Sequence, residues 1–322
     1  MVLDRRAVCF VVYAVFAFGA CGAEKEGYPR RPIRVVTAEP GGGIDFASRL
    51  LAQGLTAALG QQVVVDNRGS ASGIIAAQTV ARAQPDGYTL LFYGSTVWIA
   101  QLLRAGVAYE PLRDFAPVML AASSPYILIV HPALPAKSVR ELIALAKGRP
   151  GEMNYASGGI GVSNHLGAEL FKSMAGISIV HVPHKGTGGA LNAMMGGQVQ
   201  MMFSTAGSAA PHVRSGRVRA LAITTEQPSA LLPDLPTVAA TLPGYSLTTD
   251  YGMFAPAGTP SNIIARINRE CARILALQDV KDKLTNVGVE IVSSLPEQLA
   301  AGVKAELAKW GKVIRAAGIR ED

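Results

Sequence analysis

The stretch that decides the fold is IRVVTAEPGGGIDFASRLLAQGLTAALG, which runs from Ile33 to Gly60. Its first five residues favour β-structure and predict a strand, and the Pro and Gly residues at 40–43 end that strand. Apolar residues then recur with a 3.6-residue period up to Gly60, which predicts a helix with Asp45 as a candidate cap. The stretch is therefore a strand followed by a helix, the first part of a βαβ unit.

The same alternation continues for two more strands. Residues 62–67 predict a strand, the Gly- and Ser-rich turn at 69–73 opens a helix to about residue 83, and residues 88–93 predict a third strand after the turn at 85–87. A βαβαβ order implies a mostly parallel sheet with helices on its faces. The expected fold class is therefore α/β.

The βαβαβ order returns in the second half of the chain, which indicates two similar lobes. Strands are expected at 153–156, 178–182 and 200–203, with helices at 163–175 and 190–195 between them. Landmarks such as Asp45 and Ser163 lie 118 positions apart, far more than the period of a solenoid.

The chain is expected to cross between the lobes twice. The second lobe begins near Tyr126, and the chain returns near 248–256, because a long helix from about 259 to 277 has no partner in the second lobe. Lobe 1 is thus expected to comprise 28–125 plus 249–322, and lobe 2 to comprise 126–248. Two crossings between lobes make a hinge.

The first 20 residues have the layout of a secretory signal peptide. Arg5 and Arg6 precede a 14-residue apolar stretch at 7–20, which is too short to span a bilayer. The sequence FGAC at 18–21 is similar to a bacterial lipobox and predicts lipidation at Cys21, followed by a tether at 21–27, whereas cleavage after Ala23 would release a free protein. Both routes place the protein in the periplasm.

Composition and charge exclude several classes of function. With 322 residues, 49% hydrophobic and 16% charged, the chain is long enough for two cores and has no apolar run of membrane-spanning length. Its three Cys residues cannot build a disulfide framework. Removal of residues 1–20 leaves 28 basic and 22 acidic residues, and the basic ones are scattered, so nucleic acid is not an expected partner.

Four Gly-rich turns follow predicted strands, at 40–43, 69–73, 157–161 and 185–189. In open parallel sheets, ligands bind at the carboxyl ends of the strands, where helix N-termini present unpaired N–H groups and the positive end of the helix dipole. With two such turns in each lobe, the natural ligand is an anion with two groups, one held by each lobe. No metal or cofactor is required.

Catalytic constellations are poorly supported. Gly43 and Asp66 imitate a dinucleotide fingerprint, but Phe46 occupies the position of the third glycine. His181 and His184 point to opposite faces of a strand, and no Cys or carboxylate completes a metal site. No Gly-x-Ser-x-Gly elbow occurs. The alternative that stays open is an exported hydrolase or oxidoreductase acting on a small carboxylate in the same cleft.

Nearly the whole chain from Tyr28 resembles the extracytoplasmic solute receptors of tripartite tricarboxylate transporters, the Bug-type family. The motifs that carry the resemblance are Tyr28-Pro29, Gly42-Gly43 with Asp45 and Arg49, Val65-Asp66-Asn67-Arg68, Pro85-Asp86-Gly87-Tyr88-Thr89, Asp114-Phe115, Asn154-Tyr155-Ala156-Ser157, His165-Leu166, Val182-Pro183 with Lys185-Gly186, Pro243-Gly244-Tyr245 and Phe254-Ala255-Pro256-Ala257-Gly258-Thr259-Pro260. The resemblance implies a two-lobed periplasmic-binding-protein fold of the Venus-flytrap type II. It also implies a receptor that hands a small carboxylate to membrane permease subunits. We expect this receptor to be a monomer without catalytic activity.

Departures from the family pattern bear on the ligand. His184 replaces a tyrosine, and Ser204 and Thr205 stand where many relatives have an acidic and an amide residue. An ammonium group needs an acceptor to offset its burial, so we expect a mono- or dicarboxylate without an amino group; Glu39 or Asp45 would be the substitute acceptor. Both an aliphatic and an aromatic ligand stay open, and Tyr93 or Tyr155 would cover the ring of an aromatic one. The predicted ligand contacts are Gly42, Gly43, Asp45, Ser95, Thr96, Ser157, Gly158, Ser163, His184, Lys185, Gly186 and Ser204.

Overall fold

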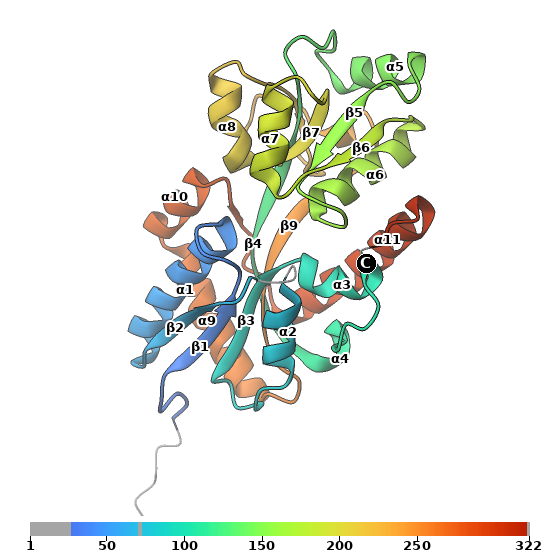
Figure 1. Ribbon diagram of the computed structural model, residues 1–322. Helices are drawn as coiled ribbons and strands as arrows, with labels where there is room; N and C mark the ends of the chain where they lie inside the picture. The colour runs from blue at the N-terminus through green and yellow to red at the C-terminus, as the bar shows by residue number, and fades with distance from the viewer. Residues whose placement is uncertain (1–26, 70–72, 321–322) are drawn as a thin grey trace, which may run out of the picture.

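The computed structural model describes residues 27–69 and 73–320 (Figure 1). Residues 1–26 lie outside the described residues, and they include the expected signal peptide, Cys21 and all of the expected tether except its last residue. Residues 70–72 of the second Gly-rich turn also lie outside them. Within the described part of the chain, no helix combines the length and the apolar character needed to cross a membrane.

The first lobe contains the expected βαβαβ unit. Its elements are β1 (Ile33–Thr37), α1 (Gly43–Leu59), β2 (Val63–Asn67), α2 (Ile74–Ala81), β3 (Thr89–Gly94), α3 (Thr96–Leu103) and α4 (Pro111–Asp114). β1 pairs in parallel with both β2 and β3, which gives the order β2-β1-β3. α1 ends where predicted, because Gly60 adopts φ 69° and its amide bonds the Thr56 carbonyl.

The second lobe repeats this arrangement. Its elements are α5 (Val139–Gly148), β5 (Asn154–Ser157), α6 (Ser163–Ala175), β6 (Val180–Pro183), α7 (Thr187–Met195), β7 (Met201–Thr205), α8 (Ala206–Arg214), β8 (Arg219–Ile223) and the 3-10 turn η2 (Val238–Ala240). β5 pairs in parallel with β6 and β7, so the order β6-β5-β7 matches β2-β1-β3 of the first lobe. The predicted internal repeat is confirmed by this shared strand order.

Two long strands, β4 (Phe115–Val130) and β9 (Thr248–Pro256), join the lobes (Figure 1). β4 pairs with β9 up to Pro125 and with β7 and β8 from Tyr126 onward. The predicted α/β fold class is confirmed; every pairing of β4 and β9 is antiparallel, so the sheet as a whole is mixed. The reason is that one strand leaves the first lobe and the other returns to it, so they must run in opposite directions.

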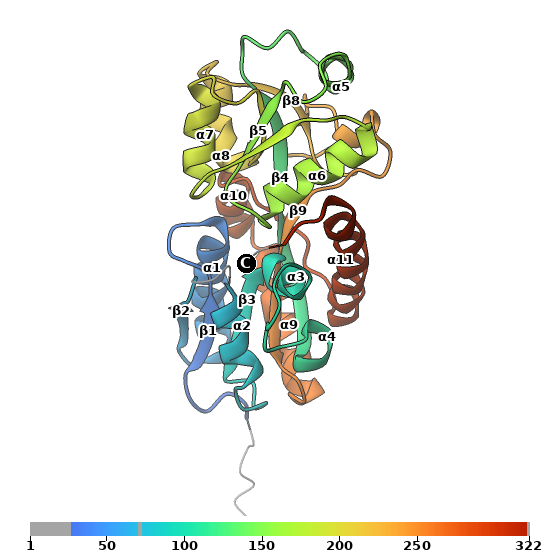
Figure 2. The same cartoon turned by 45° about the vertical axis from the view of Figure 1, so that its right-hand side comes forward.

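The C-terminal segment returns to the first lobe as α9 (Ser261–Ala276), α10 (Gln278–Asn286), β10 (Glu290–Ile291) and α11 (Pro296–Ala317). α9 packs beside α1 on one face of the sheet, with Cys271 fully buried among apolar side chains as predicted. α11 lies on the other side, against α3, α4 and β4, and its far end reaches α6 of the second lobe (Figure 2). α11 therefore contacts both lobes, which the sequence did not predict.

Candidate functional site

A pocket of about 390 Å³ lies between the lobes, beside the strands that join them. Its first-lobe wall consists of the turn Gly41, Gly42 and Gly43 with Phe46 and Tyr251, and its second-lobe wall is formed by Thr205, Gly207 and Ser208. A Cβ atom at Gly43 would lie 2.7 Å from the hydroxyl oxygen of Tyr251, so glycine is needed for this close approach. The pocket thus combines the N-terminus of α1 with the N-terminus of α8.

Asp45 holds the turn that precedes α1, although it is not the helix cap predicted from the sequence. α1 begins at Gly43 with Gly42 as its N-cap. The Asp45 carboxylate accepts hydrogen bonds from the Gly41 amide at 3.0 Å, from Asn67 Nδ2 at 2.7 Å and from Arg49 Nε at 3.1 Å. Burial alone would raise the pKa of Asp45, but these hydrogen bonds outweigh it and keep the pKa below its ordinary value.

The second lobe holds its equivalent turn in the same way with a different residue. His165 is the third residue of α6, as Asp45 is of α1, and its Nδ1 accepts a hydrogen bond from the Gly161 amide at 3.0 Å. Asp45 therefore corresponds to His165, and the sequence match of Asp45 with Ser163 was wrong by two residues. Each lobe ties a glycine amide to a side chain four positions later, which fixes the entry to the helix.

Ser157 and Gly158 organise the second-lobe turn from within. The Ser157 hydroxyl is fully buried; it donates to the Gly159 carbonyl at 2.7 Å and lies 2.7 Å from His181 Nε2. The Gly158 amide donates to Asn164 Oδ1 at 3.3 Å. Both predicted contact groups are thus engaged inside the lobe, where they shape the loop.

The next turn, at 184–186, is bonded to this loop. The Gly186 amide donates to the Gly158 carbonyl at 3.0 Å, and a Cβ atom at Gly158 would lie 3.0 Å from the Thr187 amide nitrogen. His184 Nδ1 donates to the Val182 carbonyl at 3.0 Å, so its Nε2 is the nitrogen left for a ligand. Lys185 is exposed beside it. The two predicted contact loops of the second lobe, 157–158 and 184–186, are therefore joined by a hydrogen bond.

The other four hydroxyl residues that were predicted to contact the ligand differ in their location and burial. Ser95 and Thr96 lie where β3 leads into α3, at the inner end of the first lobe. Ser163 hydrogen-bonds the buried Tyr126 hydroxyl, which in turn lies 2.9 Å from Thr249 Oγ1 of β9. Ser204 is fully buried within β7, and its hydroxyl has no hydrogen-bond partner among the described residues.

Two hydroxyl residues line the pocket from β7 and α8, namely Thr205 and Ser208, and neither was among the predicted contacts. Their hydroxyl groups are 2.9 Å apart. The only sequence feature that could have identified them as ligand contacts was their position just after the strand predicted to end at 203. The prediction of Tyr155 as a cover for an aromatic ligand was wrong, since its ring is fully buried and its hydroxyl donates to Glu169 at 2.5 Å.

A polar cluster on α11 supports the strands between the lobes. The Glu306 carboxylate accepts from Trp98 Nε1 at 2.6 Å and from Trp310 Nε1 at 3.4 Å. Burial, then the negative charge of Asp250 on β9, raises the pKa of Glu306 to about 7. Lys309 donates to the Ser246 carbonyl at 2.5 Å, just before β9 begins. No sequence pattern predicted this cluster, which joins α3, α11 and β9.

The described residues contain no group of three His, Cys, Asp or Glu side chains that could hold a metal ion. Two lobes of equal strand order, joined by two strands and facing each other through helix N-termini, define a solute receptor of the periplasmic-binding-protein class. More narrowly, the chain belongs to the tripartite tricarboxylate transporter family receptors, whose pattern it matches over residues 47–319.

Individual relatives agree with this assignment. BugT of Bordetella pertussis is 33% identical, with 99% of each chain covered. Among solved structures, Rpa4515 of Rhodopseudomonas palustris with adipate is 36% identical with a TM-score of 0.79, covering 91% of this chain and 99% of the other. MatC of Rhodopseudomonas palustris, solved with bound malate, is 33% identical with a TM-score of 0.75 and coverages of 89% and 100%.

Proposed function

We propose that the protein captures a small organic carboxylate between its lobes, outside the cytoplasm, and delivers it to the membrane permease subunits of a tripartite transporter. The observation that carries the proposal is the pair of glycine turns at 41–43 and 157–161, each tied to the first turn of a helix by Asp45 or His165. Such turns supply N–H groups and helix dipoles for anions. The family membership and the adipate and malate bound by relatives support the same chemistry.

The lobes that would close on this ligand are 28–125 plus 249–322 and 126–248. The change of strand partners between Pro125 and Tyr126 supports the first boundary, and the start of β9 at Thr248 supports the second. We propose that the receptor acts as a monomer without catalytic activity, held in the periplasm with a lipid at Cys21. Small-angle scattering should show a smaller radius of gyration with saturating ligand, and intact mass of the mature protein should show acyl chains.

The ligand is proposed to lack an amino group. Asp45 is already occupied by three donors, so it is not available to an ammonium group. Ser204 and Thr205 contribute hydroxyl groups, which serve carboxylate or hydroxyl partners. Glu39 is exposed, and its side chain lies against Gly69, where a Cβ atom would overlap it. It is therefore the acidic residue that a competing amino-acid ligand would use.

Two measurements test this proposal. Native mass spectrometry of the purified protein identifies a ligand that copurifies with it. Calorimetry then compares succinate with aspartate, and adipate with 2-aminoadipate. We expect tighter binding of the member without the amino group, and an unchanged preference in Glu39→Gln. Gly43→Ala should weaken binding at least about tenfold through its contact with Tyr251. Gly302→Ala is the matched control, because a Cβ atom there meets nothing within 4 Å. Preference for the amino acids would refute the ligand class, and turnover detected by NMR would favour the exported enzyme instead.

A further inference from the structure

Two histidines lie beneath the loop 157–161 that leads into α6. The rings of His165 and His181 stack with centroids 4.0 Å apart and an interplanar angle of 16°. Tyr155 extends the stack, since its ring centroid lies 4.8 Å from that of His181. All three rings belong to the second lobe, on β5, α6 and β6.

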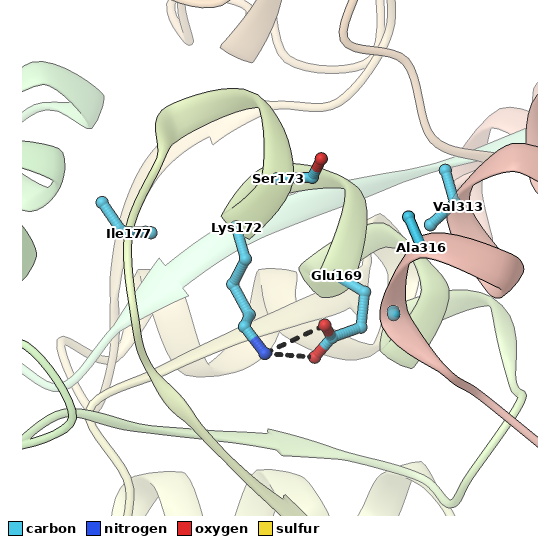
Figure 3. A pocket seen from close by; sticks show the side chains of 7 residues that line it. Glu169, Lys172, Ser173, Ile177, Val313 and Ala316 are labelled. Atoms are coloured by element: carbon cyan, nitrogen blue, oxygen red, sulfur yellow. Dashed lines mark hydrogen bonds and ion pairs between the residues drawn. The ribbon is translucent and has the colours of Figure 1, made fainter.

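The outer end of this stack is anchored on α6. The Tyr155 hydroxyl donates to Glu169, which also accepts from Lys172 at 2.7 Å. Glu169 and Lys172 line a pocket of about 280 Å³ against Val313 and Ala316 of α11, and Figure 3 shows their ion pair. The stack therefore runs from the α11 side of the lobe to the glycine turn.

The inner end of the stack fixes the glycine turn through two hydrogen bonds. His165 Nδ1 accepts from the Gly161 amide at 3.0 Å, and His181 Nε2 lies 2.7 Å from Ser157 Oγ. That oxygen also accepts from the Gly159 amide at 3.2 Å. Gly159 and Gly161 have φ of 146° and 77°, which an L side chain rarely adopts, so the loop follows a path that few sequences permit.

The bond to Gly161 requires a neutral imidazole. A protonated ring carries hydrogen on both nitrogens and cannot accept, and two protonated rings 4.0 Å apart would repel each other. Burial lowers the pKa of His165, and burial together with the neighbouring His165 lowers the pKa of His181 to about 4. The pair is therefore uncharged at neutral pH and takes up protons only in acid.

The charged groups around the pair have opposing effects. Glu169 raises and Lys172 lowers the pKa of both histidines, and His184 on the same strand as His181 lowers the pKa of His181. Tyr155 stays neutral, because burial and Glu169 raise its pKa. None of these neighbouring groups reverses the effect of burial on the pKa of either histidine.

We infer that His165, with His181 stacked against it, is a positioning residue that holds the loop 157–161 in its carboxylate-binding form as a neutral imidazole, so that its protonation weakens binding. This inference rests on the proposed function, because it takes that loop as half of the carboxylate site. Acid then lowers affinity for the anion. A histidine that contacted the ligand directly, as predicted for His184, would have the opposite effect because its positive charge would attract the anion.

The test compares wild type with His165→Asn between pH 7.5 and pH 4, with succinate and adipate as probes in calorimetry. The asparagine amide oxygen can occupy the place of Nδ1 and accept from Gly161 at every pH, and protonation of the probe cancels in the ratio of the two affinities. We expect near-equal affinities at pH 7.5 and a wild-type affinity about tenfold weaker than that of the variant at pH 4, the effect of one hydrogen bond. His165→Leu, which lacks an acceptor, should bind about tenfold more weakly at pH 7.5.

A second measurement does not depend on a ligand. In ¹⁵N NMR of the free protein, the Gly161 amide should be protected from exchange at neutral pH, lose protection as His165 is protonated, and keep it in His165→Asn. Identical pH profiles of affinity for wild type and His165→Asn, or a Gly161 amide insensitive to His165 protonation, would overturn the inference. A wild type that binds no carboxylate while Gly161 follows His165 would overturn the proposed function alone.

Discussion

The lobes touch through their main chains at Gly207 and Gly288, and a single methyl group at Gly207 tests whether this contact sets their spacing. Gly207 is the second residue of α8, and Gly288 follows α10 with φ 74°. A Cβ atom on Gly207 would lie 2.6 Å from the Val287 carbonyl oxygen, a distance that real Cβ atoms essentially never show. Ser124 Oγ of β4 donates to the Gly288 carbonyl at 3.0 Å, so the opposing segment is fixed to the strands between the lobes.

The magnitude follows from the geometry. Ordinary contact begins at 3.4 Å, so Gly207→Ala requires the two segments to separate by about 0.8 Å, and no side-chain rotation can relieve a clash with main chain. A ligand hydrogen bond of about 2.9 Å that spans the cleft would lengthen beyond useful range. Loss of one or two such bonds, each worth about 1 to 1.5 kcal/mol, weakens binding by about ten- to a hundredfold. Alanine itself favours the α8 helix, so the folding of the second lobe should change little.

Calorimetry with succinate or adipate measures the effect, thermal unfolding reports stability, and small-angle scattering reports the separation of the lobes. Gly302→Ala, on the exposed face of α11, should leave all three unchanged. Unchanged affinity together with a normal unfolding curve would refute the reasoning, because the lobes would then accommodate the methyl group without opening. A large fall in the unfolding temperature would instead assign the loss to folding.

Two further substitutions probe the turns and the hinge. Asp45→Asn removes the negative charge of the carboxylate to which Gly41, Asn67 and Arg49 donate. In urea unfolding, the free energy of unfolding should fall by about 1 to 3 kcal/mol, and a fall below about 0.5 kcal/mol would contradict the role assigned to Asp45. Burial raises the pKa of Glu306 in the folded protein to about 7, whereas the ordinary pKa of a glutamate is about 4.5, so wild-type stability should fall as the pH rises from about 4.5 to about 7. Glu306→Gln should remove this dependence in urea unfolding, and an unchanged slope would rule out Glu306 as its source.

Local sequence patterns predicted the elements well, because one helix or strand is specified by its own residues. α6 begins at Ser163 and ends at Ala175 as predicted, since Gly161 breaks the chain before it and Gly176 adopts φ 61° after it. The turn roles were harder to predict. Asp45 has a cap-like residue type, yet the hydrogen bond from Asn67 arrives from a separate strand, 22 positions away in the sequence. The equivalence of Asp45 and His165 is a match of position and not of residue type.

The contacts between the lobes could not be predicted, because they depend on how two separately folded units meet. Ser204 was chosen as a ligand contact from its place in the family pattern, but the next residue, Thr205, lines the pocket, since side chains alternate along β7 and the strand ends there. The position of α11 across both lobes likewise follows from packing of its far end on α6. A period of apolar residues predicts a helix but not which surface that helix covers.

The two lobes hold equivalent turns with chemically different residues, and this difference determines how each responds to acid. The pKa of Asp45 is lowered by its donors, so this carboxylate stays charged and continues to accept from Gly41 below its usual titration range. The pKa of His165 is also lowered, but its acceptor is the unprotonated nitrogen, which acid removes. Protonation of His165 therefore breaks the bond from Gly161 in the second-lobe turn, whereas the bond from Gly41 in the first-lobe turn does not depend on a histidine. The acid sensitivity that we propose for this receptor therefore originates in its second-lobe turn.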